Sequence, residues 1–418
     1  MASQTNPHVL IIGAGLGGLT LAQVLCNRGI SFEIFERDAQ YARSQGWGIG
    51  LHGVLDELMA NVSSDMPPIE VVDHLQPFDL PPSAMYYNNA DGSRVGVVGA
   101  RDRSIIRADR QRLHSWLSTG LSIQWQKRVV SIDEDEDAGN VTAHFADGTS
   151  ATGSLLVGAD GMHSAVRGIL LDRTGTRDPL KVLPFETLHA ELVLSGEAFE
   201  RQLSLSHSVW RVATDTDSSG PGVTLFAGLG KVLPDCRSAN YFWYLSSESP
   251  EFQLPDRKAE EVSREKLLEM ARKVVARLQP QFREVVELTE PGGIAWPPFV
   301  TSAVVLDKAS LPLGRVTLLG DAAHGMPPYR GESGVQAMRD SIKLADTISQ
   351  ISDTKATGAA LKELMGAYRD EMLERGQKSV RASIAASTAN NVGRVIWGHQ
   401  TREFPPKKIS LADIPLLK

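Results

Sequence analysis

Three short, mostly apolar runs that each stop on a glycine set the pattern of the chain. They cover 9–12, 155–157 and 316–319, and each predicts a strand buried on both faces. Apolar residues at helical spacing follow the first run over 19–28 and the third run over 335–345. Buried strands followed by helices are typical of an α/β unit, here assembled from segments far apart in the sequence.

The segment between 179 and 300 has a different pattern, in which short strands are separated by Gly, Pro, Asp and Ser turns. The predicted strands cover 188–193, 203–212, 223–229 and 241–245. Helices are predicted over 260–278 and over 356–391. We therefore divide the chain into a discontinuous first domain of 1–178 and 301–352, a second domain of 179–300, and a C-terminal helical region of 353–418.

The first apolar run leads into a glycine-rich turn, Gly13-Ala-Gly15-Leu-Gly17-Gly18, and a second strand ends on Glu36. Gly13 permits the tight turn, Gly15 lets the backbone approach a pyrophosphate, and Gly18 lets the helix pack on the strand. The N–H groups at the helix start can bind phosphate. Glu36 can accept hydrogen bonds from ribose hydroxyls and would repel a 2′-phosphate, so the turn predicts a site for FAD or NAD.

Two later segments each place an aspartate at the end of a buried strand. Asp160 is followed by Gly161, Ser164 and Arg167, and Asp321 opens the stretch GDAAHGMPPYRGESG. A carboxylate at such a position is costly to bury without a partner. The Asp321 carboxylate is therefore a candidate ligand-binding group.

In their order and spacing, these three segments resemble the motifs of the class A flavoprotein monooxygenases, the aromatic hydroxylase family. That family carries GxGxxG, then a DG segment ending in SxxR, then a GD segment reading GDAAH…P…G, and fungal enzymes that tailor natural products are the most similar. The resemblance covers about 9–341. It implies an α/β fold with a Rossmann-like FAD-binding domain, an inserted and mainly antiparallel β-sheet substrate domain, and a C-terminal helical segment.

The resemblance also implies which residues contact FAD. Asp321 would hold the ribityl chain, Asp160 would lie near the pyrophosphate, and an RxxLxxxL pattern matches Arg110, with Arg107 as the alternative. The predicted cofactor-binding residues are Gly13, Gly15, Gly18, Glu36, Arg37, Gly48, Arg110, Asp160, Asp321 and Gly334.

The GD segment departs from the family at two positions. The family usually has GxGxN where this chain reads Gly331-Glu-Ser333-Gly334-Val335, so Ser333 replaces a glycine and Val335 an asparagine. Ser333 with Gln336 fits a capping box, which would fix the start of the following helix by other means. His324, in the same segment, is expected to make a structural hydrogen bond rather than to act as an acid or base.

The second domain supplies candidates for a substrate pocket, although each of its aromatic residues fits a core position equally well. The predicted substrate residues are Trp210, Arg211, Tyr241, Trp243 and Pro328. Arg211 is the one arginine placed on a strand of the predicted sheet, and a small carboxylate substrate would need a committed arginine. A largely apolar aromatic or polycyclic substrate is therefore expected, with Arg330 as the residue that could alter this expectation.

Composition and charge argue against several other classes of protein. A formal charge of −7 argues against a general nucleic-acid binder, and the two cysteines give neither a disulfide framework nor a metal site. The sequence has no apolar run of membrane-spanning length and no signal peptide. A cytoplasmic monomer or homodimer without a metal is the expectation.

The resemblance implies an FAD-dependent monooxygenase that consumes NADPH or NADH and molecular oxygen, and that hydroxylates or epoxidises its substrate through a flavin C4a-hydroperoxide. Such an activity would belong to secondary-metabolite biosynthesis. Two alternatives stay open. One is a flavin oxidase or dehydrogenase on the same fold, and the other is a cyclase-like protein that shapes a ligand without redox turnover.

Overall fold

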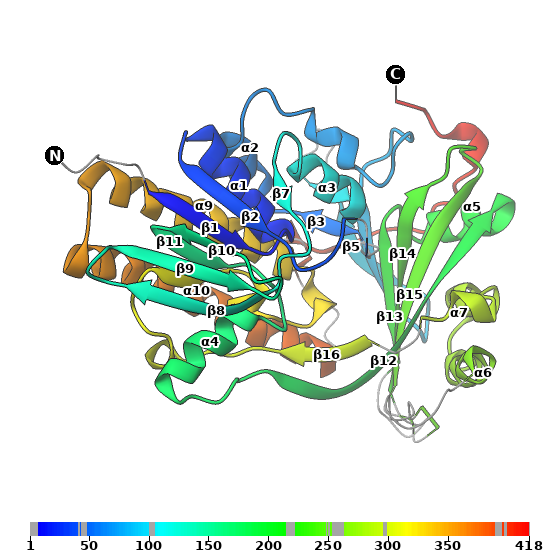
Figure 1. Cartoon of the computed structure of the whole chain (residues 1–418). Coiled ribbons are helices and arrows are strands. Elements are labelled where there is room, and N and C mark those ends of the chain that lie inside the picture. The colour runs from blue at the N-terminus through cyan, green and yellow to red at the C-terminus, as the bar shows by residue number, and fades with distance from the viewer. Residues whose placement is uncertain are drawn as a thin grey trace.

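The computed structural model describes residues 7–40, 42, 48–99, 105–214, 222–247, 249, 251–252, 263–295, 299–388, 395–396 and 399–417. Its two main layers are a parallel sheet at the N-terminal side and a larger, mainly antiparallel sheet, as Figure 1 shows. The α/β fold class expected from the sequence is confirmed.

The parallel sheet has five strands in the order β17-β11-β1-β2-β7. Their bounds are β1 His8–Ile12, β2 Ser31–Phe35, β7 Ile123–Gln124, β11 Leu155–Gly158 and β17 Val316–Leu318. The three apolar runs of the sequence supply its three adjacent strands β1, β11 and β17. Those strands are buried along nearly their whole length because helices cover them, chiefly α1 (Leu16–Asn27) and α9 (Ser333–Thr354).

Smaller elements complete this side of the molecule. A three-stranded antiparallel sheet and a β3–β6 pair flank the parallel sheet. Their bounds, with those of the neighbouring helices, are β3 Ile49–Leu51, β6 Ile106–Ala108, β8 Val129–Asp135, β9 Asn140–Phe145, β10 Ser150–Gly153, α2 Leu55–Asn61, α3 Arg110–Leu117, α4 Ala165–Thr174, α8 Asp321–His324 and α10 Gly358–Thr388.

The larger sheet has eight strands in the order β16-β12-β15-β14-β13-β4-β5-β20. Their bounds are β4 Ser83–Asn88, β5 Arg94–Val98, β12 Lys181–Ser195, β13 Val209–Ala213, β14 Val223–Val232, β15 Ser238–Ser247, β16 Phe299–Ala303 and β20 Arg402–Glu403. Three helices cover its outer face (Figure 1): α5 Gly196–Leu205, α6 Arg264–Val275 and α7 Pro280–Glu287. Its other face is turned toward the parallel sheet.

The predicted boundaries differ from the structure in two ways. The strand expected over 203–212 is instead the end of α5 followed by β13, because residues 196–205 form an amphipathic helix that packs Phe199 and Leu203 into the core. The larger sheet also recruits β4 and β5 from before residue 178 and β20 from the tail. Non-local strand pairing of this kind leaves no mark in the local sequence pattern.

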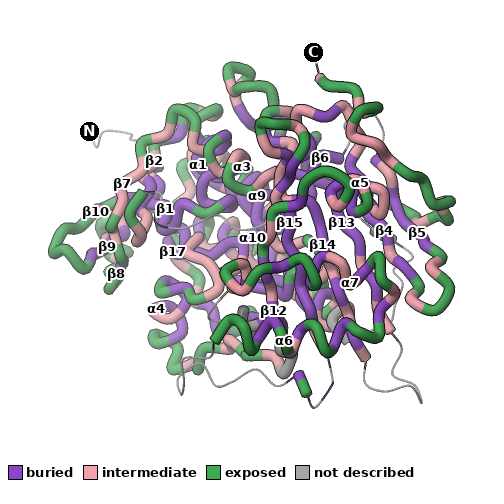
Figure 2. Tube along the Cα trace, turned by 90° about the vertical axis from the view of Figure 1, so that its right-hand side faces the viewer, coloured by how far each residue is buried: buried purple, intermediate pink, exposed green. Residues whose placement is uncertain are grey.

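The described residues after α10 form short strands and one 3-10 helix, Leu411–Asp413. β20 pairs with β5, and Leu416 forms a bridge to Phe78, so the tail lies along the larger sheet and α5. Arg94 anchors it by donating to the carbonyl oxygens of Phe404 and Pro405. Figure 2 shows the buried residues concentrated in the strands of both sheets, with exposed residues at the outer turns. None of the described helices is long and apolar enough to cross a membrane.

Candidate active site

The glycine turn after β1 has the geometry that a bound pyrophosphate needs. Gly13 has a φ of +112°, and a Cβ there would lie 2.4 Å from the carbonyl oxygen of Ala159. A Cβ on Gly18 would lie 2.0 Å from the carbonyl oxygen of Gly13, so α1 packs tightly on the strand. At Gly15, by contrast, a Cβ would meet no atom of the described residues within 4 Å. The backbone is therefore open to a ligand at the one glycine where the motif requires it.

The start of α1 is available for phosphate. Its N-cap is Gly15, and among the described residues no side chain caps the helix or places an acid in its first turn. Its first N–H groups are thus left for a ligand. Glu36, at the end of β2, lies beside them: Oε2 accepts from the Ala14 N–H at 2.8 Å and Oε1 from the Asp38 N–H at 3.0 Å. Arg37 follows and is half-buried.

Asp160 caps a helix. Its carboxylate accepts from the Ser164 hydroxyl at 2.5 Å and from the Ala165 N–H at 2.7 Å, at the start of α4. Burial raises the pKa of Asp160 above its ordinary value, against the lowering effect of these hydrogen bonds. Arg167, fully buried, pairs with Asp178 and donates to the Ala322 carbonyl oxygen at 3.0 Å, so it ties the DG segment to α8.

Asp321 is the first residue of α8 and follows Gly320, whose φ is +60°. Ser333 donates its hydroxyl hydrogen to Asp321 Oδ1 at 2.5 Å. The predicted capping box is therefore wrong: the N-cap of α9 is Glu332, and Ser333 bonds to the aspartate instead of to its own helix. The serine that departs from the family pattern thus orients the candidate cofactor aspartate.

The start of α9 packs closely against β3. A Cβ on Gly334 would lie 2.1 Å from Ile49 Cδ1, so the Ile49 side chain would have to move for any larger residue, and Val335 is buried beside Gly334. Gly48 precedes β3, and a Cβ on it would lie 3.2 Å from Arg107 Nε. Gly48, just before β3, and Gly334 on α9 therefore allow the two backbones and Arg107 to lie close together.

The two candidate arginines occupy different environments. Arg110 is exposed at the start of α3, whereas Arg107 on β6 is buried, with its Cζ 5.7 Å from the centroid of the Phe242 ring. Burial lowers the pKa of Arg107 to about 10, and no carboxylate of the described residues pairs with it. A buried cation without a counter-charge is costly, which favours a ligand oxygen as its partner. Arg107 is thus the better candidate.

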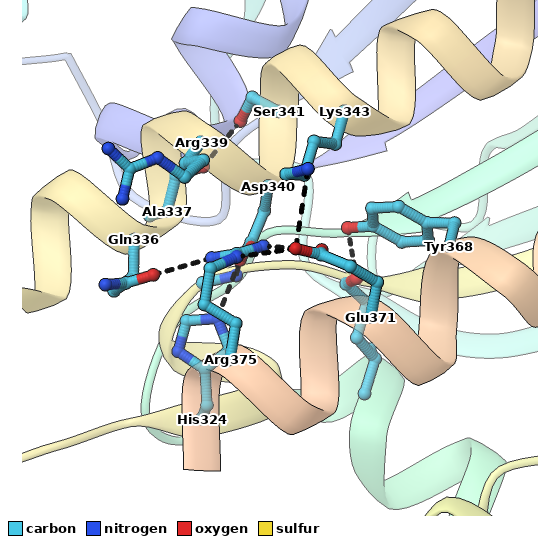
Figure 3. A network of polar contacts seen from close by, with 12 residues as sticks. His324, Gln336, Ala337, Arg339, Asp340, Ser341, Lys343, Tyr368, Glu371 and Arg375 are labelled. Atoms are coloured by element: carbon cyan, nitrogen blue, oxygen red, sulfur yellow. Dashed lines mark hydrogen bonds and ion pairs between the residues drawn. The ribbon is translucent and has the colours of Figure 1, made fainter. Parts of the chain in front are cut away.

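His324 has the acid partner that the sequence did not show. Its Nε2 lies 2.7 Å from Asp340 Oδ2, and both side chains are fully buried (Figure 3). Burial lowers the pKa of His324, but the charge and hydrogen bond of Asp340 outweigh it and raise that pKa above its ordinary value. A buried ion pair between α8 and α9 fits the expected structural role.

Strand register separates the predicted substrate residues. Trp210, Tyr241 and Trp243 face the helices: the Trp210 indole donates to Gln202 on α5, the Trp243 indole donates to Thr289, and Tyr241 packs on Phe199. Each is almost fully buried in that core. Arg211 alternates with Trp210 along β13, so its side chain points to the opposite face. The structure therefore does not bring these three aromatic residues together with Arg211.

The face turned toward the parallel sheet carries a row of cross-strand neighbours. The pairings His189↔Tyr244, Tyr244↔Phe226, Phe226↔Arg211 and Arg211↔Tyr86 join five adjacent strands, β12, β15, β14, β13 and β4. The rings of His189 and Tyr244 stack at 5.8 Å, and the Arg211 guanidinium lies 5.8 Å from the centroid of the Tyr86 ring. We name these five residues the inner row. The period-two alternation around Arg211 was the sequence signal that could have identified them.

The GD segment reaches this face through Tyr329, which follows Pro328 in a short helical turn. Its hydroxyl lies 3.2 Å from the Thr187 hydroxyl of β12. Arg330 is paired with Glu332 at 2.5 Å. Trp296 and the side chain of Phe299, two further aromatic candidates of this segment, lie outside the described residues.

Taken together, the residues fit FAD. An open glycine, an uncapped helix start and the Glu36 carboxylate lie side by side. Asp321 at the start of α8, Gly334 on α9 and Arg107 on β6 complete the set of candidate cofactor residues. Contact with the cofactor stays a prediction for each residue.

Comparison with known proteins agrees with this reading. The model of the FAD binding domain family matches residues 6–62 and 110–383. The chain is 41% identical to the FAD-dependent monooxygenase thnD of Trichoderma harzianum, over 98% of this chain and 99% of that protein. It is 29% identical to the FAD-dependent monooxygenase dbaB of Emericella nidulans, over 83% and 88% of the two chains.

Solved structures share the fold. The 2,6-dihydroxypyridine-3-hydroxylase of Arthrobacter nicotinovorans superposes with a TM-score of 0.67 at 20% identity, over 97% of this chain and 99% of that one. HpxO of Klebsiella pneumoniae, complexed with FAD and uric acid, gives a TM-score of 0.66 at 21% identity, over 92% and 88%. The family match and the near full-length similarity to thnD show that the chain belongs to the FAD-dependent monooxygenases built on this FAD-binding domain.

Proposed function

We propose that this FAD-dependent monooxygenase uses NADPH or NADH and molecular oxygen to hydroxylate or epoxidise a largely apolar aromatic or polycyclic substrate. The observation that carries the proposal is the inner row, which presents three aromatic rings and a histidine on the sheet face turned toward the parallel sheet. Aromatic side chains bind large rings by stacking and dispersion.

The charge state of the side chains on this face supports the proposal that the substrate is neutral. Burial lowers the pKa of His189 to about 4, so its ring is neutral near pH 7. Arg211 is covered by the Tyr86 ring, and Arg330 is paired with Glu332. A small carboxylate would need a cation committed to it; Arg211 and Arg330 already have neighbours, and Arg107 is assigned here to the cofactor.

Bound FAD supplies the redox and oxygen-transfer chemistry. The chain's own residues would bind and orient the two ligands: Glu36 the ribose, Asp321 the ribityl hydroxyls, and the inner row the substrate. Arg107, beside Phe242, would place positive charge where a ligand oxygen carries negative charge. The packing of Tyr329 on Thr187 would help to keep water from that space.

The fungal monooxygenases thnD and dbaB support a place in fungal secondary metabolism. A monooxygenase of that kind would act on a ring system built by an earlier enzyme.

The test is an assay of purified protein with FAD, NADPH or NADH, and a panel of neutral polycyclic phenols and benzoate-type acids under labelled oxygen. We expect substrate-stimulated oxidation of the nicotinamide and one labelled oxygen atom in the product of a neutral polycyclic compound. Product without incorporated oxygen would indicate the oxidase alternative, and product without nicotinamide or oxygen the cyclase alternative. Stimulation by benzoates alone, lost in Arg211→Ala or Arg330→Ala, would overturn the neutral-substrate proposal.

A further inference from the structure

Asp340, on α9, connects three parts of the chain that are separate in sequence. Its Oδ2 accepts a hydrogen bond from the Gly320 N–H at 2.8 Å and lies 2.7 Å from His324 Nε2. Its Oδ1 accepts from Arg375 Nη2 at 2.8 Å, from α10. Gly320 directly precedes Asp321, so Asp340 holds the backbone on which the candidate cofactor aspartate stands.

The side of α10 that faces this cluster is built from residues spaced along one helix face. Tyr368 and Arg375 are seven residues apart, and Glu371 lies between them (Figure 3). The Tyr368 hydroxyl donates to the Leu318 carbonyl oxygen at 3.1 Å, at the end of β17. Glu371 accepts from Arg375 Nε and Nη2, both at 3.0 Å. The helix thus holds the strand before the GD turn and, through Arg375, the turn itself.

Packing leaves the turn no room to shift. A Cβ on Gly376 would lie 2.4 Å from the His324 ring, so α10 lies directly against the histidine. A Cβ on Gly320 would lie 2.9 Å from Ala337 Cβ on α9. Gln336 accepts from Arg375 Nη1 at 2.6 Å and fixes the guanidinium from the α9 side. Contacts from two helices therefore determine one position for the GD turn.

We infer that Asp340 and Arg375 are positioning residues for the cofactor: Asp340 sets the Gly320–Asp321 backbone, and Arg375 holds Asp340 in place. α10 is then part of the cofactor-binding machinery, although it lies outside the three sequence motifs. The charged groups facing His324 are Asp340 from α9, Asp321 from α8 and Arg375 from α10. The inference rests on the proposed role of Asp321 in binding FAD.

The experiment measures the dissociation constant of FAD by flavin fluorescence on apoprotein, at a temperature where circular dichroism shows each variant folded. We expect Arg375→Gln and Asp340→Asn to weaken FAD binding by about tenfold or more, because each removes a charge-assisted hydrogen bond that orients the turn. Arg375→Lys, which keeps the charge, should recover most of the affinity. The flavin absorption spectrum of the two weakened variants should shift as the environment of the ring changes.

Lys362→Gln is the matched control, since Lys362 also lies on α10 but pairs with Glu136 at the surface. Its FAD affinity should equal that of the wild type. A purely architectural role would lower the melting temperature of Arg375→Gln while leaving the FAD affinity of the folded protein unchanged, and that result would overturn the inference. If Asp340→Asn does not fold, the comparison of Arg375→Gln with Arg375→Lys decides the same point.

Asp321→Ala, measured in parallel, separates the two proposals. If Asp321→Ala leaves FAD binding unchanged, the role of Asp321 is wrong. If Asp321→Ala weakens binding and both Arg375 variants do not, the positioning role alone is wrong.

Discussion

Two buried basic side chains of the candidate site, His324 and Arg107, differ in the charged groups that surround them. His324 lies in a cluster where Asp340, Arg375 and Glu371 alternate in charge and bond to one another. Arg107 lies between β6 and the larger sheet, with its Cζ 5.7 Å from the centroid of the neutral Phe242 ring, and burial lowers its pKa to about 10. The first cluster is complete within the protein. The second has a positive charge for which the described part of the chain provides no negative one.

That difference assigns the two regions different tasks. Removing one partner from a closed buried cluster leaves a charge uncompensated, so such a cluster is costly to break and is suited to holding a backbone in place. A buried cation without a carboxylate lowers the stability of the ligand-free protein and gains from a ligand that brings negative charge. The GD side of the site is thus held by its own hydrogen bonds, whereas for the Arg107 side we expect a bound ligand to supply the negative charge.

The largest effect on stability is expected from breaking the buried cluster of His324, Asp340, Arg375 and Glu371. Asp340→Ala should lower the free energy of unfolding of the ligand-free protein by about 3–5 kcal/mol, because it leaves His324 and Arg375 without their shared buried partner. Denaturation by urea measures this change. The surface pair Lys362–Glu136 is the reference, and Lys362→Ala should cost at most about 1 kcal/mol. Equal losses in the two variants would contradict the distinction between buried and surface pairs.

The next effect concerns the cofactor itself. Glu36→Ala and Asp321→Ala should each weaken FAD binding by about 1.5–3 kcal/mol, or tenfold to a hundredfold, since each removes a carboxylate that would accept hydrogen bonds from hydroxyls. Equilibrium dialysis or flavin fluorescence gives the two constants. Retention of FAD at wild-type affinity by both variants would show that these are not the cofactor residues.

Arg107→Met should keep or raise the free energy of unfolding but lower the affinity for the ligand. Replacing a buried cation by an apolar side chain of similar length should leave the ligand-free protein as stable or about 1 kcal/mol more stable. The same change should weaken FAD or substrate binding about tenfold, because a ligand oxygen loses its positive partner. Urea denaturation of the apoprotein and ligand titration of the same samples test both halves. A loss of stability without a loss of binding would assign Arg107 to the core.

The two buried histidines should give opposite pH dependence. The folded pKa of His324 lies above 6.5, so its contribution to stability is fully present below pH 6.5 and is lost as the pH rises through the folded value. The folded pKa of His189 is about 4, so stability falls as the pH drops from 6.5 toward 4. Urea denaturation at several pH values should show a difference between wild type and His324→Gln that shrinks with rising pH. For His189→Phe, the loss of stability on acidification should be smaller than in the wild type.

The smallest effects are expected from substitutions on the two faces of β15, at Trp243 and Tyr244. Trp243→Phe should lower the free energy of unfolding by about 1 kcal/mol, because the Thr289 hydroxyl loses its indole donor, and should leave substrate preference unchanged. Tyr244→Phe should change stability little but alter the KM for the substrate. Thermal denaturation and steady-state kinetics of both variants test this. If KM changed in Trp243→Phe and not in Tyr244→Phe, the substrate pocket would lie on the helix-covered face of the sheet instead.

The sequence by itself determined the parts whose physics is local. The turn at Gly13–Gly18 requires glycine where the backbone bends or packs closely, and continuous apolar runs mark strands covered on both faces, so the FAD-binding unit was predictable. The orientation of Arg211 relative to Trp210 was also within reach, since side chains alternate along any strand.

Only the tertiary structure decided what depends on distant segments meeting. Nothing local to Asp340 predicts that Gly320, His324 and Arg375 converge on it. The burial of Arg107 with no carboxylate partner among the described residues likewise arises from where β6 meets β15. The side of the larger sheet that the helices cover was decided by α5, α6 and α7, because a strand with apolar residues on both faces carries no signal of which face will be covered.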